Sequence, residues 1–463
     1  MPQTVIVQKT DGRQKAMLCY ENTSIIVKCQ GFEAKGVEFN LDRTKSVFLF
    51  RSQRKADTVS CPNCKGNVYE HGLFTYTLRD MPTLPKVEQH LHFEGHRYQC
   101  RRCGRTFNEK IPYRYPGTRI TNRAAAWIKA LLRNKITIRA VQDITGVHWE
   151  TIRNIQRDYM EEKLADRQSE LLRKGYRPKF LAVDEFAIHK GHRYATCVMD
   201  LETGEVLWVG SGRSMEDFEY FFKETDPEQL SDVQAVAMDM NASYNRLVEK
   251  HMPKATIVYD RYHMQAQYGK DVLGVVRLSE ARKHKEAAKQ LQSEDKQEDR
   301  SARLHRKQQI KSEQANYAKL KKLRWTLLRN GSQLSDAGQD YLNNILQEHA
   351  ELAVCYAMKE EMIRLFELRD PQEAERGWVE WFAAAKASGI EPLVKFATLK
   401  EKRLSGLTAH AAFPISTGKL EGFNNKIKVA KRVGYGYRDE SYFFTLIRFL
   451  SLPTVKSDSY NFP

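Results

Sequence analysis

The sequence predicts a multidomain α/β protein, in which small N-terminal modules precede a mixed-sheet domain that is interrupted by an all-helical insertion. Three observations support this prediction: two Cys-x-x-Cys pairs, a helical segment with a glycine break, and a series of strand-like runs from about residue 178. Since a chain of 463 residues exceeds what one hydrophobic core supports, we expect about two to four domains.

The chain is strongly basic, with 75 Lys and Arg against 58 acids and a net charge of +17. This balance favours a polyanionic partner, although a membrane surface or simple solubility would also account for it. Between residues 95 and 135, eleven Lys and Arg accompany a single acid, Glu109; a solvated basic surface is the alternative explanation. No apolar run approaches the roughly 20 residues of a membrane span. We therefore expect a cytoplasmic protein whose eight cysteines are reduced or bound to metal.

Residues 1–55 alternate apolar and polar side chains, as in Ser24–Lys28 and Val37–Leu41, and predict a small N-terminal β region. Cys19 and Cys29 are expected to be small core residues of this region.

Two cysteine pairs, Cys61-Pro-Asn-Cys64 and Cys100-Arg-Arg-Cys103, provide four thiolates, the ligand number of a closed structural zinc site. The 35 residues between the pairs exceed the usual spacing of about 15–20, so an inserted hairpin is required. Redox-active or incidental cysteines are the alternative. We expect a zinc ribbon over residues 56–115 that holds a structural Zn²⁺.

Residues 118–175 predict a helix-turn-helix domain. A first helix from Thr121 is followed by a short second helix, which carries Ile138, Val141 and Ile144, and Gly146 lies in the turn before a third helix. An ordinary helical hairpin would show similar periodicity. The third helix is expected to present base-reading side chains outward, namely Trp149, Thr151, Arg153, Asn154 and Arg157.

Residues 178–264 predict three strands, a helix, a strand, a helix and a strand. The expected ranges are 180–183, 194–199, 206–209, 215–222, 233–238, 244–250 and 256–259. This is the element order of the RNase H-like fold, in which the first and fourth strands are neighbours. Asp184 closes the first strand and Asp239 the fourth, so we expect two adjacent carboxylates, the ligand type that Mg²⁺ prefers.

Residues 265–412 predict long, charge-dense helices such as Glu280–Gln314, which would form a helical insertion with a solvated face of alternating charge. Trp325, Trp378 and Trp381 are expected in its core; stacking on an unpaired base is the alternative.

Residues 413–463 predict a further helix of the α/β domain that supplies a third acid. Leu420, Phe423 and Ile427 recur at helical spacing and form a core-facing stripe. Glu421 would bind metal, and the polar residues that follow would contact phosphate: Asn424, Asn425, Lys428, Lys431 and Arg432. An acid that merely favours the helix dipole is the alternative, but it does not explain those amides and cations.

Six short sequence blocks are distinctive enough to compare with known protein families. They are Arg101–Phe107, Val183–Phe186 with Lys190–His192, Asp239–Tyr244, Asp260–His263, Glu421–Lys428 and Arg432–Tyr437. In these blocks the chain resembles bacterial DDE transposases of insertion sequences, of the ISL-three type. The resemblance implies a catalytic set of Asp184, Asp239 and Glu421 that holds two Mg²⁺ or Mn²⁺ ions. Such a set cleaves the element ends and joins the freed 3′-OH to target DNA.

The resemblance also implies double-stranded DNA as the partner, both terminal inverted repeats and target DNA, and a homodimer or higher oligomer associated with the bacterial nucleoid. The zinc ribbon, with Arg101, Arg102 and Arg105, and the helix-turn-helix would bind the repeats. A structure-specific nuclease or resolvase, and an inactive DNA-binding regulator, are the alternatives. Asp260 also ends a strand, but strand order favours Asp239, which leaves Asp260 and His263 in supporting positions.

Overall fold

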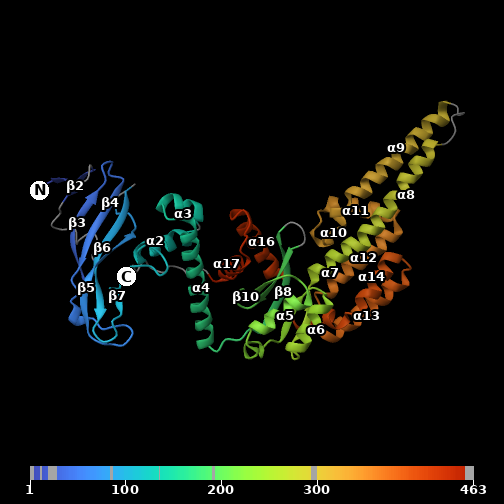
Figure 1. Cartoon of the computed structure of the whole chain (residues 1–463). Coiled ribbons are helices and arrows are strands. Elements are labelled where there is room, and N and C mark those ends of the chain that lie inside the picture. Colours follow the sequence, from blue (N-terminus) through green and yellow to red (C-terminus); the bar gives the residue numbers. More distant parts are fainter. Residues whose placement is uncertain are drawn as a thin grey trace. The chain divides into compact units, whose positions relative to one another are not determined.

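The computed structural model describes residues 5–10, 13–18, 29–83, 87–134, 136–189, 193–293 and 300–453. The chain divides into two compact units, with the boundary between Ala165 and Asp166. The colours of Figure 1 run along the sequence and show which elements belong to each unit. Cys19, the strand expected at Ser24–Lys28 and the Lys190–His192 block lie outside the described residues.

The first unit contains one seven-stranded sheet, of order β1-β2-β3-β4-β6-β5, with β7 paired to β6. Its strands are β1 Val5–Thr10, β2 Arg13–Leu18, β3 Phe32–Phe39, β4 Lys45–Ser52, β5 Val68–Arg79, β6 Glu88–Cys100 and β7 Thr106–Asn108. The parallel pairing of β4 with β6 joins the N-terminal β region to the cysteine-rich segment in one sheet, where separate modules were expected. Phe48, Phe50 and Phe93 share one core there, and Cys29 is buried in it as predicted.

Three helices follow the sheet: α2 Asn122–Arg133, α3 Ile138–Thr145 and α4 Trp149–Arg173. Gly146 ends α3 with a left-handed φ of 62°, the conformation that favours glycine at this position. Val141 of α3 is buried, whereas Ile144 is 50% exposed. Thr145 is buried instead, and its hydroxyl is satisfied by donating to the carbonyl of Val141 at 2.7 Å.

The second unit is built on a five-stranded sheet of order β10-β9-β8-β11-β12. Its strands are β8 Phe180–His189, β9 Arg193–Asp200, β10 Val206–Ser211, β11 Ala235–Met238 and β12 Thr256–Tyr259. The first three strands pair antiparallel, whereas β8, β11 and β12 are parallel. This topology confirms the predicted RNase H-like core.

Helices cover both faces of this sheet. Alternate residues of β11 and β12 belong to different cores: Val236 packs with helices α5 (Met215–Glu224) and α6 (Ala242–His251), whereas Val258 packs with Ala409 of α15 (Leu404–Ala412). The strands are therefore buried on both sides, as the apolar runs predicted.

The insertion is all-helical, as predicted. Its remaining helices are α7 Arg261–Tyr268, α8 Gly274–Ser293, α9 Arg300–Lys322, α10 Arg324–Leu328, α11 Asp336–Glu348, α12 Ala350–Leu365, α13 Pro371–Ala387 and α14 Glu391–Glu401. The chain then returns to the sheet through α15, α16 (Gly418–Val433) and α17 (Glu440–Ser451). Trp378 and Trp381 are core residues, but Trp325 is 66% exposed, so its core placement was wrong. Within the described ranges, every helix is too short or too polar to cross a membrane.

Candidate active site

Asp184 lies in the middle of β8, not at its end. The parallel ladder with β11 stops at Ala182, but the antiparallel ladder with β9 continues to His189. Asp184 therefore stands just beyond the last residue paired to β11, on a strand that extends past its neighbour. Its side chain is 15% exposed, and this burial raises the pKa of its carboxyl.

Asp239 directly follows β11, and His263 lies between it and Asp184. The His263 ring places Nε2 at 4.0 Å from Oδ1 of Asp184 and Nδ1 at 3.8 Å from Oδ2 of Asp239. The two acids thus share one ring as a neighbour, as the strand order predicted. Asp239 is the more accessible of the two, with 45% of its side chain exposed.

Asp260 follows β12 but is 1% exposed, and both of its oxygens are occupied. Oδ1 accepts from the backbone N–H of Tyr262 (2.7 Å) and of His263 (3.2 Å), which caps the N-terminus of α7. Oδ2 accepts from the N–H and the hydroxyl of Thr417, both at 2.8 Å. Asp260 therefore ties the end of β12 to the start of α16, and it offers no accessible oxygen to a ligand.

Glu421 lies in the first turn of α16 with its side chain exposed. One turn later, Nδ2 of Asn424 donates to Oδ2 of Asp184 at 2.9 Å. Two turns beyond that, Nζ of Lys431 donates to the carbonyl of Ala187 at 2.7 Å. These two contacts fasten α16 along β8, which brings the helix that carries Glu421 to the strand that carries Asp184.

Asn424 and Lys431 thus face β8, where contacts to DNA phosphate were expected. Asn424 is 7% exposed because it lies one turn from both Leu420 and Ile427, which are buried. Asn425, Lys428 and Arg432 are exposed, as expected for side chains that meet a ligand.

The donor set suits a hard divalent cation. It offers carboxylate oxygens from β8, from the end of β11 and from α16, and Oδ1 of Asn424 is buried beside Asp184 without a hydrogen-bond partner. The three carboxylates do not all lie within 4.8 Å of one another; in the described part of the chain only the four cysteines form a group that compact.

The four cysteines do form a compact cluster, as predicted. Sγ of Cys61 lies 3.7 Å from that of Cys103, and Sγ of Cys64 lies 3.5 Å from that of Cys100. A tetrahedron with Zn–S bonds of about 2.3 Å has sulfur–sulfur edges of about 3.8 Å, so the spacing fits zinc. Hydrogen bonds from the backbone N–H groups of Cys103 and Arg102 lower the pKa of the Cys100 thiol, whereas the neighbouring thiols raise the pKa of Cys64, so Cys100 ionises first of this pair.

The expected DNA-reading side chains differ in exposure. Trp149 and Asn154 are exposed, whereas Thr151, Arg153 and Arg157 are half-buried on α4. The guanidinium of Arg153 lies 5.7 Å from the centre of the Trp149 ring. Three arginines next to the second cysteine pair are exposed: Arg101, Arg102 and Arg105.

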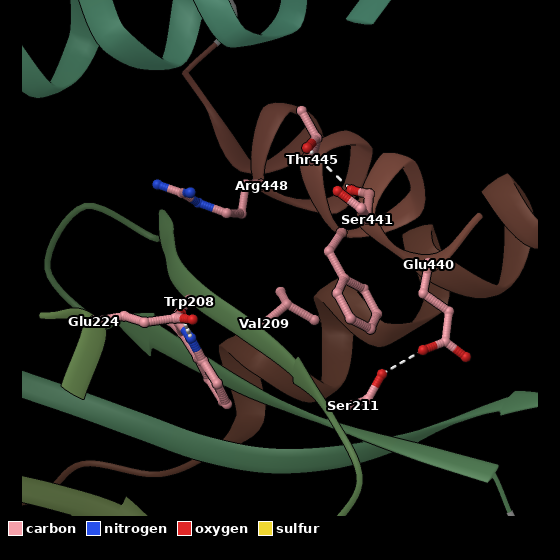
Figure 2. Close-up of a pocket in the computed structure, with 9 residues that line it drawn as sticks. Trp208, Val209, Ser211, Glu224, Glu440, Ser441, Thr445 and Arg448 are labelled. Atoms are coloured by element: carbon pink, nitrogen blue, oxygen red, sulfur yellow. Dashed lines mark hydrogen bonds between the residues drawn. The ribbon is translucent and has the colours of Figure 1, made fainter. Parts of the chain in front are cut away.

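A pocket of 340 Å³ opens elsewhere in the second unit, between β10 and α17 (Figure 2). Glu224 and Glu440 line it; Glu224 accepts from the Trp208 indole N–H at 2.6 Å, and Glu440 accepts from the Ser211 hydroxyl. None of the three candidate acids borders this pocket, which is lined by two glutamates and by Arg448. The candidate site is instead the surface at which β8, β11 and α16 meet.

Comparison with known proteins decides the family. A family model described as the transposase of ISL3 type matches residues 181–447, more than half of the chain. This chain belongs to the ISL3 transposase family. A second model, the helix-turn-helix domain of ISL3 transposases, matches residues 116–160 and confirms the predicted motif. The protein is therefore a transposase of insertion-sequence elements with a DDE catalytic domain.

Two relatives support the assignment over most of the transposase. It is 32% identical over 422 residues to the transposase for insertion sequence element IS1001 of Bordetella parapertussis. The matched region covers 90% of this chain and 95% of the relative. It is 24% identical over 397 residues to the transposase for element IS1557 of Mycobacterium tuberculosis, which covers 85% and 76% of the two chains.

The catalytic-domain match spans all three acids and the entire helical insertion. DDE and helix-turn-helix domains together imply a divalent metal and DNA binding. Sequence reasoning missed one cation of this transposase: Nζ of Lys400, on α14, lies 3.5 Å from Sδ of Met240, the residue after Asp239. Burial lowers the pKa of Lys400. Only the folded insertion brings it there, so no local pattern in the sequence could have indicated it.

Proposed function

We propose that Asp184, Asp239 and Glu421 hold the divalent cations of this transposase, two Mg²⁺ or Mn²⁺ ions. With them the enzyme cleaves the ends of its element and joins the 3′-OH to target DNA. The observation that carries the proposal is the contact of Asn424 with Asp184. This contact brings the first turn of α16, with Glu421, close to β8, which carries Asp184. Strand β11, which Asp239 directly follows, pairs with β8.

The protein's own side chains define the geometry of the reaction. Asn424 orients the Asp184 carboxylate through Oδ2, and Asp260 holds the starts of α7 and α16 in place. His263 places a ring nitrogen beside each of the two aspartates. A bound divalent cation supplies Lewis acidity and neutralises charge on the phosphodiester that reacts. The exposed Asn425, Lys428 and Arg432 extend along α16 from Glu421, and we assign them to the DNA backbone.

The first unit is assigned to recognition of the terminal inverted repeats. The zinc ribbon (56–115) would hold a structural Zn²⁺ on Cys61, Cys64, Cys100 and Cys103, with Arg101, Arg102 and Arg105 on phosphate. The helix-turn-helix (118–175) would read bases with the exposed Trp149 and Asn154, supported by Thr151, Arg153 and Arg157. Joining two ends requires two such units, so we propose a homodimer or larger assembly on DNA.

The test uses the full chain, Mg²⁺, labelled element-end duplexes and a target plasmid. Asp184→Ala, Asp239→Ala and Glu421→Ala are each expected to abolish cleavage and joining while end binding stays within about twofold. Asp340→Ala, an exposed acid on α11, is the matched control and should keep full activity. Cleavage by the unaltered chain without joined products would indicate a nuclease, and activity in any of the three acid variants would remove that residue from the site.

A further inference from the structure

Helices α8 and α9 form a hairpin that extends beyond the other helices of the insertion (Figure 1). Near its base, the guanidinium of Arg277 donates to the carbonyl of Leu320, and Nδ1 of His284 lies 2.6 Å from a carboxylate oxygen of Glu313. The Leu320 side chain is buried against the insertion core. The outer part of α9 is exposed along most of its length, so packing does not explain its composition.

The hairpin carries much of the positive charge of the chain. The two helices contain thirteen Lys and Arg against three acids, a net charge of +10 out of +17 for the whole protein. Two of the acids already have partners: Glu280 pairs with Lys283 and His349, and Glu313 with His284. By sequence, residues 294–299 between the two helices have a net charge of −3. The segment remains strongly basic when this charge is included, and the proposed surface does not use these residues. The expected alternation of signs was therefore wrong for α9, which has a single acid.

Four of these cations form a stripe along one side of α9. Arg300, Arg303, Lys307 and Lys311 recur every three or four residues, so they project from one face over a length of about 16 Å. All four are exposed, and within the described residues none of them forms an ion pair. A DNA strand presents one phosphate per about 3.4 Å of helix axis, so such a stripe can contact several phosphates.

We propose that this hairpin is a second duplex-DNA surface of the transposase, which binds the phosphate backbone without sequence preference. The inference rests on the proposed function. The exposed face of α9 has one large apolar residue, Leu304, so it lacks the apolar stripe that a membrane or a packed partner helix requires. A second copy would present the same cations and be repelled. Because the hairpin belongs to the same compact unit as the three acids, the DNA bound here is bound at the catalytic unit.

The test compares two triple variants with the same loss of charge. The first is Arg303→Ala/Lys307→Ala/Lys311→Ala. The matched control is Arg376→Ala/Lys395→Ala/Lys402→Ala, which removes exposed cations from α13, from α14 and from the residue that follows α14. Binding is measured in EDTA to an element-end duplex and to an unrelated duplex of equal length, across a range of salt, so that catalysis plays no part.

We expect the hairpin variant to bind the unrelated duplex about tenfold more weakly at moderate salt, with a log–log salt slope that is lower by roughly 2–3. The control should change neither value by more than about twofold. Unchanged binding of the element end would assign the hairpin to target DNA, whereas equal weakening would assign it to both duplexes. A hairpin variant that matches the control in affinity and slope overturns the proposal. This test measures binding alone, so its outcome does not depend on the activity of the three acid variants. The hairpin proposal and the proposed catalytic acids can therefore be refuted independently.

Discussion

Replacement of Asp260 by alanine tests whether this acid organises the site or binds metal. The substitution removes the N-terminal cap of α7, which contributes about 1–2 kcal/mol. It also leaves the buried N–H and hydroxyl of Thr417 without their acceptor, and hydrogen bonds to a charged group contribute about 1.5–3 kcal/mol each but not additively. The expected loss in free energy of unfolding is therefore about 3–4 kcal/mol, combining these two effects.

Asp370→Ala is the matched control. Asp370 caps α13 in the same way, through the N–H of Glu373, but it is exposed and its side chain contacts no second segment in the described structure. Its loss should cost about 1 kcal/mol. Urea unfolding followed by tryptophan fluorescence suits the measurement, because Trp208, Trp378 and Trp381 are buried in the second unit. Thr417→Val, alone and combined with Asp260→Ala, measures the coupling across the tie, which should exceed about 1 kcal/mol.

The activity of the same variants completes the test. Asp260→Ala should reduce the turnover of strand joining, because the first turn of α16 loses its anchor, yet the unfolding midpoint should fall with it. Asp239→Ala should remove activity at a cost in stability below about 1 kcal/mol, since Asp239 is 45% exposed. The contrary result is an Asp260→Ala variant that unfolds no more easily than Asp370→Ala but loses all metal-dependent activity. In that case Asp260, not Asp239, is the second acid.

Three further predictions follow from burial and charge. In EDTA at neutral pH, Asp184→Asn should be more stable than the unaltered chain, because burial raises the pKa of Asp184 and disfavours its ionised form. This difference in stability should vanish as the pH falls through the raised pKa towards the unfolded value of about 3.9, since the carboxyl is then protonated in both states. A gap that widens on acidification would contradict this. Chelation of zinc, or Cys100→Ser, should weaken element-end binding and lower the zinc content, whereas Cys29→Ala should leave the zinc content unchanged, since Cys29 lies in a separate core. Trp378→Ala should cost about 3–5 kcal/mol and Trp325→Ala under about 0.5 kcal/mol; equal effects in urea titrations would contradict their difference in exposure.

The parts of the fold that local pattern determines were predictable. The apolar runs that became β8, β11 and β12 are buried on both faces, so their hydrophobicity alone located them and their order gave the sheet. The pairing of β4 with β6 was not predictable in this way, because partners such as Phe48 and Leu91 are far apart in the sequence. The apolar pattern of a strand does not indicate which other strand it pairs with.

Errors within the site have similar causes. Asp184 was placed at a strand end because its apolar run stops there, yet the length of β8 is decided by β9, its antiparallel partner. Asn424 was assigned to DNA from its position on the helix, but the strand against which α16 packs decides which polar residues point inward.

The tie between Asp260 and Thr417 spans 157 positions of the sequence. It closes the insertion into a loop whose two ends are fixed beside each other, irrespective of what lies between them. Closure entropy grows only logarithmically, so doubling or halving such a loop changes the free energy by about 0.6 kcal/mol. Lineages could therefore lengthen, shorten or exchange the helices of the insertion, including the α8–α9 hairpin, while the acids on either side of it keep their arrangement. The remoteness of Glu421 in the sequence thus costs the catalytic centre little, and it leaves the intervening chain free to change with the DNA that each element meets.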